Sequence, residues 1–430
     1  MPILLPNSTN YVHPWEPNLA DLHHAMDYDA QGQPIIRVGD TANSHTSKNR
    51  LRTSQFSTWF FSTSQFDTGL DIWDQSTDNG ATITHNPLQS AITMKTTSTI
   101  GSKAVRQTRQ VMPYIPGRPA EFSMAHRWEV PVLGVRKRIG VFDENNGVFF
   151  EDGGNQNYYC VVRSKVSGSV VETRVQRTDW NGEKFDGKGP SGIVADPNAI
   201  QLLIIEYEWY GAGAVHFNFI MNGIKHRIHS FYHANRVHDV YMSTPFLPIR
   251  AEIENISATA PGEMIIASTS FGLEGTSTRV GLPLVQQIPL PGHTLSTANT
   301  FYPVISIRLK PGSLSGIAIL EKLQFFTVDN TTLAYRIYVN PTLTGGTWVD
   351  HELPNSLLQV NTTATAITGG TIFYRGIVPV NGTEIVLDTG GAFQLARNTM
   401  GTVGDVVTIA LTAFNSNKTA VGTAMWREMR

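Results

Sequence analysis

The sequence predicts a mainly β protein, with two β-sandwich domains of jelly-roll-like topology behind an extended N-terminal arm. Turn signals are the first observation: Asn222-Gly223 separates the alternating segments 215–221 and 224–231, and this dipeptide favours a tight hairpin because both turn positions need φ > 0. Asn146-Gly147 and Ser167-Gly168 predict two further hairpins. Composition is the second observation: charged residues make up 16% of the chain, against roughly 25% in ordinary soluble proteins. So low a content of charged residues favours a protein with β-rich surfaces over a helical cytosolic enzyme.

Residues 1–55 are expected to form the arm, because prolines at positions 2, 6, 14, 17 and 34 interrupt regular structure early. A short helix is expected from Leu19 to Met26, with Asn18 as its N-cap. An isolated arm cannot hide its apolar side chains, so it must dock on its own body or on a partner. The residues expected to make that contact are Tyr11, Trp15, Leu19, Leu22, Ile35 and Ile36.

The rest of the chain divides into two β domains. Residues 56–280 carry many short apolar or alternating segments, which predict the larger sandwich. Among them, Leu202–Ile205 predicts a strand that is buried on both faces. Residues 281–300 are punctuated by proline and glycine and are expected to be a linker. Residues 301–430 predict a smaller C-terminal sandwich.

Charge and cysteine content exclude several classes of function. The formal net charge is −2, and the basic cluster Arg136-Lys137-Arg138 is expected to be a solvated face, so nucleic-acid binding is not expected. Cys160, the single cysteine, lies in an apolar segment, where it suits a buried thiol and folding in a reducing cytoplasm. The N-terminus does not have the pattern of a signal peptide, and no apolar window is long enough to span a membrane, so membrane insertion is not expected.

The loop from Asp179 to Gly192 is the candidate ion site. Its oxygen-bearing residues, which are of the type that Ca²⁺ prefers, are Asp179, Asn181, Glu183 and Asp186. The spacing matches a calcium loop only loosely, since the glycine falls early and no glutamate closes the loop; an ordered polar turn explains the same residues. We therefore predict no cofactor and no catalytic metal. A sugar site is a further option, because Trp180 lies beside these polar groups.

A group of histidines suggests a second metal site: His216, His226, His229, His233 and His238. In this region the alternating pattern predicts strands, and on a strand His226 and His229 would point to opposite faces. We therefore expect structural or solvent-facing histidines.

Glu206 and Glu208 are the carboxylate pair that an enzyme would need. They share one face of a predicted strand and precede Trp209 and Tyr210. Residues two apart on a strand lie about 7 Å apart, a separation compatible with the acid and base of a glycosidase. Glutamates alternating with apolar residues are also the ordinary pattern of a half-exposed strand. Because the chain also has no nucleophile-elbow or zinc-helix motif, the sequence indicates a protein that is not an enzyme.

Several blocks of sequence resemble those of virion structural proteins of tailed bacteriophages, including cyanophages. In addition to the loop at 179–192, the blocks are residues 140–151 (GVFDENNGVFFE), 241–253 (YMSTPFLPIRAEI), 22–28 (LHHAMDY), 32–38 (GQPIIRV) and the ending Trp426-Arg427-Glu428. The resemblance covers most of residues 19–256 and extends loosely to the C-terminal domain. It implies a component of a virus particle and supplies no catalytic residue.

The resemblance therefore leads us to expect a non-enzymatic virion protein of the tail, baseplate periphery or fibre. It would fold in the host cytoplasm and assemble with other virion proteins through the arm, as a homo-oligomer, with a trimer preferred for a fibre. The alternatives are a capsid decoration or neck-associated protein, and a glycan-binding or glycan-cleaving adhesin with a host-surface glycan as its partner.

Overall fold

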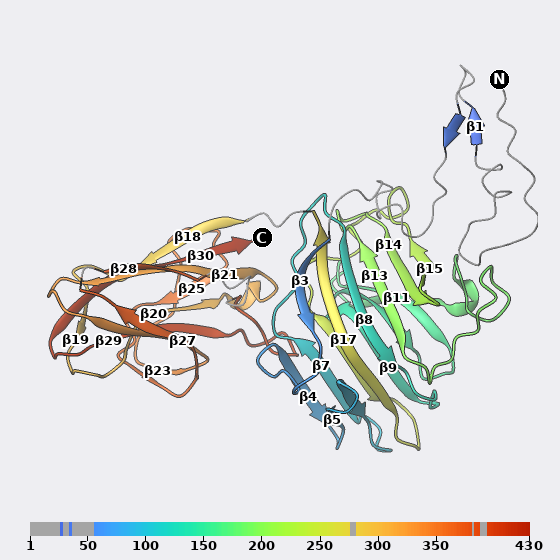
Figure 1. The fold of residues 1–430 in the computed structure, drawn as a ribbon, viewed down its shortest axis with the longest axis horizontal. Coiled ribbons are helices and arrows are strands. Elements are labelled where there is room, and N and C mark those ends of the chain that lie inside the picture. Colours follow the sequence, from blue (N-terminus) through green and yellow to red (C-terminus); the bar gives the residue numbers. More distant parts are fainter. Residues whose placement is uncertain (1–25, 29–33, 37–55, 276–280, 381, 388–393) are drawn as a thin grey trace, which may run out of the picture. The chain divides into compact units, whose positions relative to one another are not determined.

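The computed structural model describes the chain except residues 1–25, 29–33, 37–55, 276–280, 381 and 388–393 (Figure 1). The chain forms two compact units, residues 1–53 and 54–430, which are considered separately. In the first, β1 (Met26–Tyr28) pairs antiparallel with β2 (Pro34–Ile36), which contains Ile35 and Ile36 of the expected contact. The other expected contact residues and the predicted helix up to residue 25 lie outside the described residues. Met26 begins a strand.

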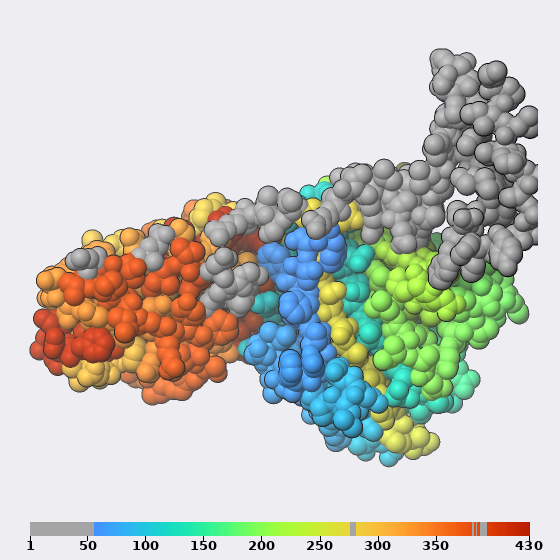
Figure 2. All heavy atoms as spheres, viewed as in Figure 1, coloured from blue at the N-terminus to red at the C-terminus, as the bar shows by residue number. Residues whose placement is uncertain are grey.

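The second unit begins with a large sandwich of two antiparallel sheets (Figures 1 and 2). One sheet, called the β9 sheet, has the order β12 (Val171–Gln176), β11 (Tyr158–Ser164), β10 (Gly147–Asp152), β9 (Val135–Phe142), β16 (Ile249–Asn255), β7 (Lys103–Thr108), β4 (Trp73–Asp78). The other, called the β13 sheet, has the order β15 (Ile224–Phe231), β14 (Val215–Met221), β13 (Gln201–Tyr207), β8 (Ala120–Arg127), β17 (Glu263–Glu274), β6 (Ala91–Lys95), β5 (Thr82–Asn86). β3 (Phe56–Ser62) also pairs with β17, and Figure 2 shows both strands on the surface.

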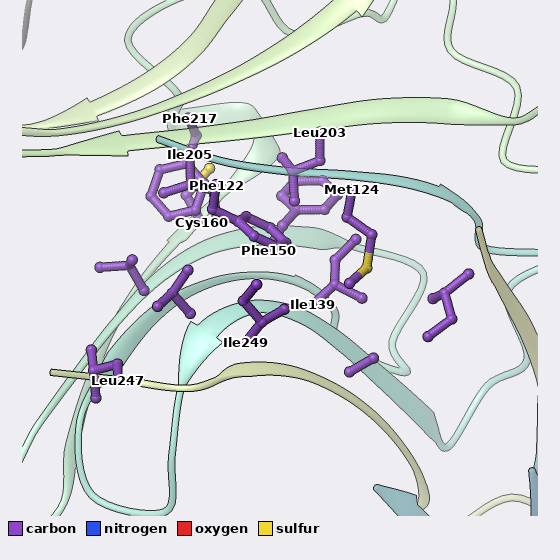
Figure 3. Packing of buried hydrophobic residues seen from close by; sticks show 14 of the residues in the cluster. Phe122, Met124, Ile139, Phe150, Cys160, Leu203, Ile205, Phe217, Leu247 and Ile249 are labelled. Atoms are coloured by element: carbon purple, nitrogen blue, oxygen red, sulfur yellow. The ribbon is translucent and has the colours of Figure 1, made fainter. Parts of the chain in front are cut away.

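The core lies between these two sheets. Phe122, Leu203 and Phe217 face it from the β13 sheet (Figure 3). Ile139 and Phe150 face it from the β9 sheet, and each of these five side chains is at most 3% exposed. Alternation of apolar and polar residues along each strand places one apolar face inside, as the sequence predicts.

Three predicted hairpins are confirmed. β9 and β10 pair around the turn at Asn146-Gly147, β11 and β12 pair around Ser167-Gly168, and β14 and β15 pair around Asn222-Gly223. Asn222 has φ of 53° and Gly223 has φ of 77°, the left-handed conformation that this two-residue turn requires. Leu202–Ile205 falls within β13, but Leu202 is 36% exposed, so the strand is not buried on both faces as expected.

We expect Gly223→Val to destabilise the large sandwich by about 1–2 kcal/mol, because a β-branched side chain is strained at this φ. A Cβ at position 223 would meet no other atom within 4 Å, so the effect would come from the backbone alone. Chemical denaturation followed by tryptophan fluorescence measures it. Gly312 is the matched control, because a Cβ there is also unobstructed and its φ is not positive. If Gly223→Val and Gly312→Val changed stability equally, the argument from φ would be wrong.

The basic cluster at 136–138 is not a solvated face as expected. Lys137 is fully buried on the core side of β9, where its ammonium donates to the carbonyl of Trp128 and lies 3.8 Å from Asp152. Burial lowers the pKa of Lys137. Arg138 points the other way and donates to Glu151 at 2.6 Å. The sequence pattern missed this because buried charges in a strand are rare unless they are paired, as both are here.

The small sandwich follows, again with antiparallel sheets. The first contains β18 (Leu282–Gln287), β30 (Lys418–Met429), β21 (Ile317–Thr327) and β28 (Thr383–Val386), with β19 (His293–Leu295) also pairing with β30. The second contains β24 (Val349–Asp350), β25 (Leu358–Asn361), β20 (Tyr302–Leu309), β29 (Val406–Ala413), β22 (Leu333–Val339) and β27 (Thr371–Val378). β23 (Thr342–Thr344) pairs with β26 (Ala366–Thr368).

The segment 281–300 is therefore not a linker as expected. It supplies the strands β18 and β19, and its Ile288 and Leu295 lie in the core of the small sandwich. The fold class is confirmed, since the only helices among the described residues are two 3₁₀ turns, Arg177–Asp179 and Pro311–Ser313. No described helix is long and apolar enough to cross a membrane.

Polar contacts join the two sandwiches, and the surface where they meet is the junction. Arg397 of the small sandwich donates to Asp143 at 2.8 Å, and both side chains are less than 10% exposed. Arg250 of the large sandwich donates to the carbonyl of Thr399 at 3.2 Å, while the Thr399 amide donates to Asp74 at 2.7 Å. A small apolar cluster adds to these contacts: Val111, Ile317 and Met429.

The sequence blocks 140–151 and 241–253 meet at this junction. Asn146, from the block 140–151, accepts hydrogen bonds from the amide and hydroxyl of Ser243, in the block 241–253. Arg250, also in the second block, donates to Glu144 in the first at 2.6 Å. These blocks therefore build the surface on which the small sandwich docks.

Candidate functional site

The candidate site lies on the face of the β13 sheet that points away from the core, at the end of β13. Leu203, Ile205 and Tyr207 of this strand point into the core and are fully buried. By alternation, Glu206 belongs to the opposite face. Glu208 lies one residue beyond the end of β13, so a shared strand face for the two carboxylates stays a prediction.

Glu206 is part of a buried ionic network on this face. The ammonium of Lys225 lies 2.5 Å from one oxygen of Glu206 and 3.5 Å from Glu121 of the neighbouring strand β8. The amide of Asn218 donates to the other Glu206 oxygen at 3.4 Å. Because Lys225, Glu206 and Asn218 are all less than 10% exposed, solvent screens these charges little. Both oxygens of Glu206 therefore accept hydrogen bonds, one from Lys225 and one from Asn218.

A series of hydrogen-bonded polar side chains extends this network toward β15. A ring nitrogen of His216 lies 2.8 Å from the hydroxyl of Ser230. The amide side chain of Asn181 donates to the Ser230 carbonyl and accepts from the Ser230 amide, both at 2.9 Å. The loop that starts at Asp179 is therefore fastened to the site.

Aromatic residues continue the strand beyond Glu208. The Trp209 indole donates to the carbonyl of Met242 at 3.1 Å and meets the Tyr114 ring edge to face, with ring centres 6.1 Å apart. The Tyr210 amide donates to the Tyr114 hydroxyl at 3.1 Å, and Tyr210 remains 46% exposed. Burial raises the pKa of Tyr114 to about 12, so this phenol stays protonated at neutral pH. Tyr210 is thus the exposed aromatic residue just beyond β13, next to the half-buried Trp209 and the buried Tyr114.

The candidate ion loop uses its oxygens for its own backbone. Glu183 accepts hydrogen bonds from the amides of Lys184, Phe185 and Ser191, which lower the pKa of its carboxyl against the effect of burial. Asp186 accepts from the amide of Lys188 at 2.9 Å, and Asn181 is held by Ser230. Among the described residues, no three His, Cys, Asp or Glu side chains gather closely enough to hold a metal ion. The calcium hypothesis for Asp179, Asn181, Glu183 and Asp186 gains no support here.

The histidines make structural contacts. The His229 ring accepts from the Asn181 amide at 3.2 Å, and the His233 ring lies 2.6 Å from the carbonyl of Gly213. The prediction that His226 and His229 point to opposite faces of the strand is wrong. A register shift in the β14–β15 pair sets His226 opposite Phe219 and His229 opposite Phe217, residues on one face of β14. The bulge therefore cancels the expected separation of His226 and His229.

We expect stability to fall as the pH drops below about 6.5, because of His126. This ring is fully buried against Trp128, and burial lowers its pKa to about 3. Between about pH 6.5 and 3 the unfolded chain binds a proton that the folded chain refuses, so unfolding is favoured by about 2 kcal/mol at pH 5. Denaturation at pH 7.5 and pH 5 measures the loss, and His126→Phe should reduce it by about 2 kcal/mol. The remainder comes from other histidines such as His229, whose pKa burial lowers to about 4. Glu252, whose pKa is held low, acts only in more acidic solution. Equal pH dependence in the variant would contradict this assignment.

Solved structures of glycoside hydrolases are similar to part of the chain. No family model and no curated protein matches it. A glycosyl hydrolase family 16 protein from Mycobacterium smegmatis is 9% identical, covers 50% of this chain and 100% of its own, and has a TM-score of 0.36. A Bacillus licheniformis β-glucanase is 9% identical, with 52% and 100% covered and a TM-score of 0.33. A Shewanella oneidensis protein of unknown function, SO2946, is 8% identical, with 56% and 95% covered and a TM-score of 0.35.

This comparison corrects one expectation. The sequence led us to exclude an enzyme, whereas glycoside hydrolases are among the structures to which the chain is similar, so that exclusion does not stand. At such low identity and TM-score, no residue of this chain takes a role from those proteins. The chemistry must come from the side chains described above.

Proposed function

We propose that the protein acts on glycans through the large sandwich, at the end of β13. One observation carries the proposal: the exposed Tyr210 and the half-buried Trp209 follow Glu206 and Glu208 in the chain and pack beside the buried ring of Tyr114. A sugar ring has an apolar C–H face and a polar rim, so aromatic rings beside hydrogen-bonding groups match it.

Recognition is the part of this proposal that the geometry supports best. Tyr210 is 46% exposed and Trp209 is half-buried, so both can meet a ligand, whereas Glu206 and Glu208 are buried behind them. Cleavage is the second candidate, favoured by the presence of two neighbouring glutamates, because inverting glycosidases use a pair of carboxyl groups. In that reaction, Glu206, which is 2.5 Å from the Lys225 ammonium, would be the base.

A glycan panel tests both parts. We expect the purified protein to bind members of the panel and Tyr210→Ala to weaken that binding about tenfold, the equivalent of one aromatic contact. Tyr374→Ala is the control, since that tyrosine is similarly exposed, at 42%, in the small sandwich. If the protein also released reducing ends from a glycan, and Glu208→Gln abolished this release, the protein would cleave glycans as well as bind them. A protein that bound and cleaved nothing in the panel would contradict the proposal.

We also propose that the protein performs this role within a tailed-phage particle, as the sequence resemblance implies. The long blocks 140–151 and 241–253 support this proposal. Mass spectrometry of separated heads and tails tests it and places the protein in one of them.

The arm at residues 1–55 carries the attachment in this proposal, so deletion of residues 1–50 should abolish incorporation into particles while both sandwiches stay folded. Copy number is measured by quantitative mass spectrometry of purified particles, and circular dichroism checks that the truncated protein is folded. Normal incorporation of the truncated protein would contradict the arm's role.

A further inference from the structure

A cleft at the junction carries an inference about the ligand. Its walls come from both sandwiches and enclose about 430 Å³, within the range of roughly 300–1,000 Å³ for small-molecule sites. Tyr114, Trp209 and Phe246 supply aromatic surface from the large sandwich. The small sandwich supplies Ser315, Leu357 and Arg430, and places the turn at Gly312 beside them. Trp209, just beyond β13, therefore forms part of one wall of an open cleft.

The hydroxyl groups of this cleft offer both kinds of hydrogen bond. Ser243 donates its hydroxyl proton to Asn146 at 3.0 Å, so its oxygen remains an acceptor toward the cleft. Ser315 accepts from the Arg397 guanidinium at 3.1 Å, so its own O–H remains a donor. A ligand whose hydroxyl groups both donate and accept satisfies the two at once.

The charge of the cleft is balanced. Among the described residues that line it, Arg430 alone is charged, and its guanidinium donates to Glu428 at 3.0 and 3.2 Å. Glu428 in turn accepts from the Ser356 hydroxyl and the Leu357 amide. An anionic ligand would have to compete with Glu428 for Arg430, while a neutral one would not.

We propose that this junction cleft binds one neutral sugar ring of the glycan, with the ring stacked against Trp209 and its hydroxyl groups bonded to Ser243 and Ser315. The inference rests on the proposed function and adds two things to it: the ligand is uncharged, and both sandwiches form the site.

Isothermal titration with short oligosaccharides of glucose and galactose, and with matched oligosaccharides of uronic acids, tests the inference. We expect binding of a neutral oligosaccharide that falls about tenfold or more in Trp209→Ala and in Gly312→Trp. A Cβ at Gly312 meets no other atom within 4 Å, so a larger side chain can start from this position toward the cleft, and circular dichroism checks that the variant is folded. Trp348→Ala is the control, because Trp348 is also half-buried and lies in the small sandwich under Arg308.

The outcomes separate the inference from the proposed function. If both cleft variants bound oligosaccharides as the wild type does and Tyr210→Ala lost binding, the cleft would not be the binding site, while glycan recognition by the protein would still stand. If the oligosaccharides of uronic acids bound more tightly than the neutral ones, the inference that the ligand is uncharged would be wrong. No binding of any oligosaccharide by the wild-type protein would overturn both.

Discussion

Asp143→Asn is expected to destabilise the protein by about 3–5 kcal/mol, because it leaves the buried Arg397 guanidinium without its counter-charge. The two groups are 2.8 Å apart, with side chains 8% and 6% exposed. Asparagine keeps an oxygen for the amides of Asn145 and Asn146, which Asp143 also binds, so the change isolates the charge. Calorimetry should show the single transition of the joined sandwiches separating into two.

Two further variants check this interpretation. Glu263→Gln breaks the exposed pair with Lys95, whose side chains are 34% and 52% exposed, and should cost no more than about 1 kcal/mol. The double variant Asp143→Asn/Arg397→Met should recover much of the lost stability, since removing both charges leaves none uncompensated. If the double variant were as unstable as the single one, the charge pair would not be the source of the loss.

This junction also bears on the cleft. Arg397 donates to Ser315 as well as to Asp143, so the pair positions one of the hydroxyl groups proposed to meet the sugar. We therefore expect Asp143→Asn to weaken oligosaccharide binding even at temperatures where the protein stays folded.

Local features of the fold could be read from the sequence. Asn222-Gly223 fixes the turn, and with it the pairing of Ile220 with Lys225, so the sequence already places Lys225 on the face of Asn218. The outward direction of Glu206 followed from alternation along β13. Each of these inferences uses residues close together in the chain.

Long-range features could not be read in this way. The segment 281–300 looked like a linker because of its prolines, but β18 lies at the edge of its sheet, where Pro283 can sit without breaking a ladder between two neighbours. The contact of Lys225 with Glu121 depends on β8 lying next to β13, about 80 residues away along the chain. No local pattern encodes that neighbour, and the same holds for the cleft, whose walls come from both sandwiches.

Lys225→Met is expected to destabilise the large sandwich by about 3–5 kcal/mol, because it removes the buried cation that lies 2.5 Å from Glu206 and 3.5 Å from Glu121. Methionine preserves the length and the apolar stem of lysine, so packing changes little. The double variant Glu206→Gln/Lys225→Met removes both charges and should restore most of the stability. Urea denaturation of the three variants, with Glu206→Gln alone as the third, gives the coupling energy of the pair.

Glycan binding by the double variant then separates two roles of the network. If Glu206 and Lys225 only hold the β13 sheet together, the double variant should bind oligosaccharides as the wild type does, because Trp209 and Tyr210 stay in place. If Glu206 is the base of a cleavage reaction, the double variant should bind but release no reducing ends. A double variant that is stable but binds no oligosaccharide would show that the buried charges are needed for binding. That result would contradict the proposal that Trp209 and Tyr210 make the contact with the ligand.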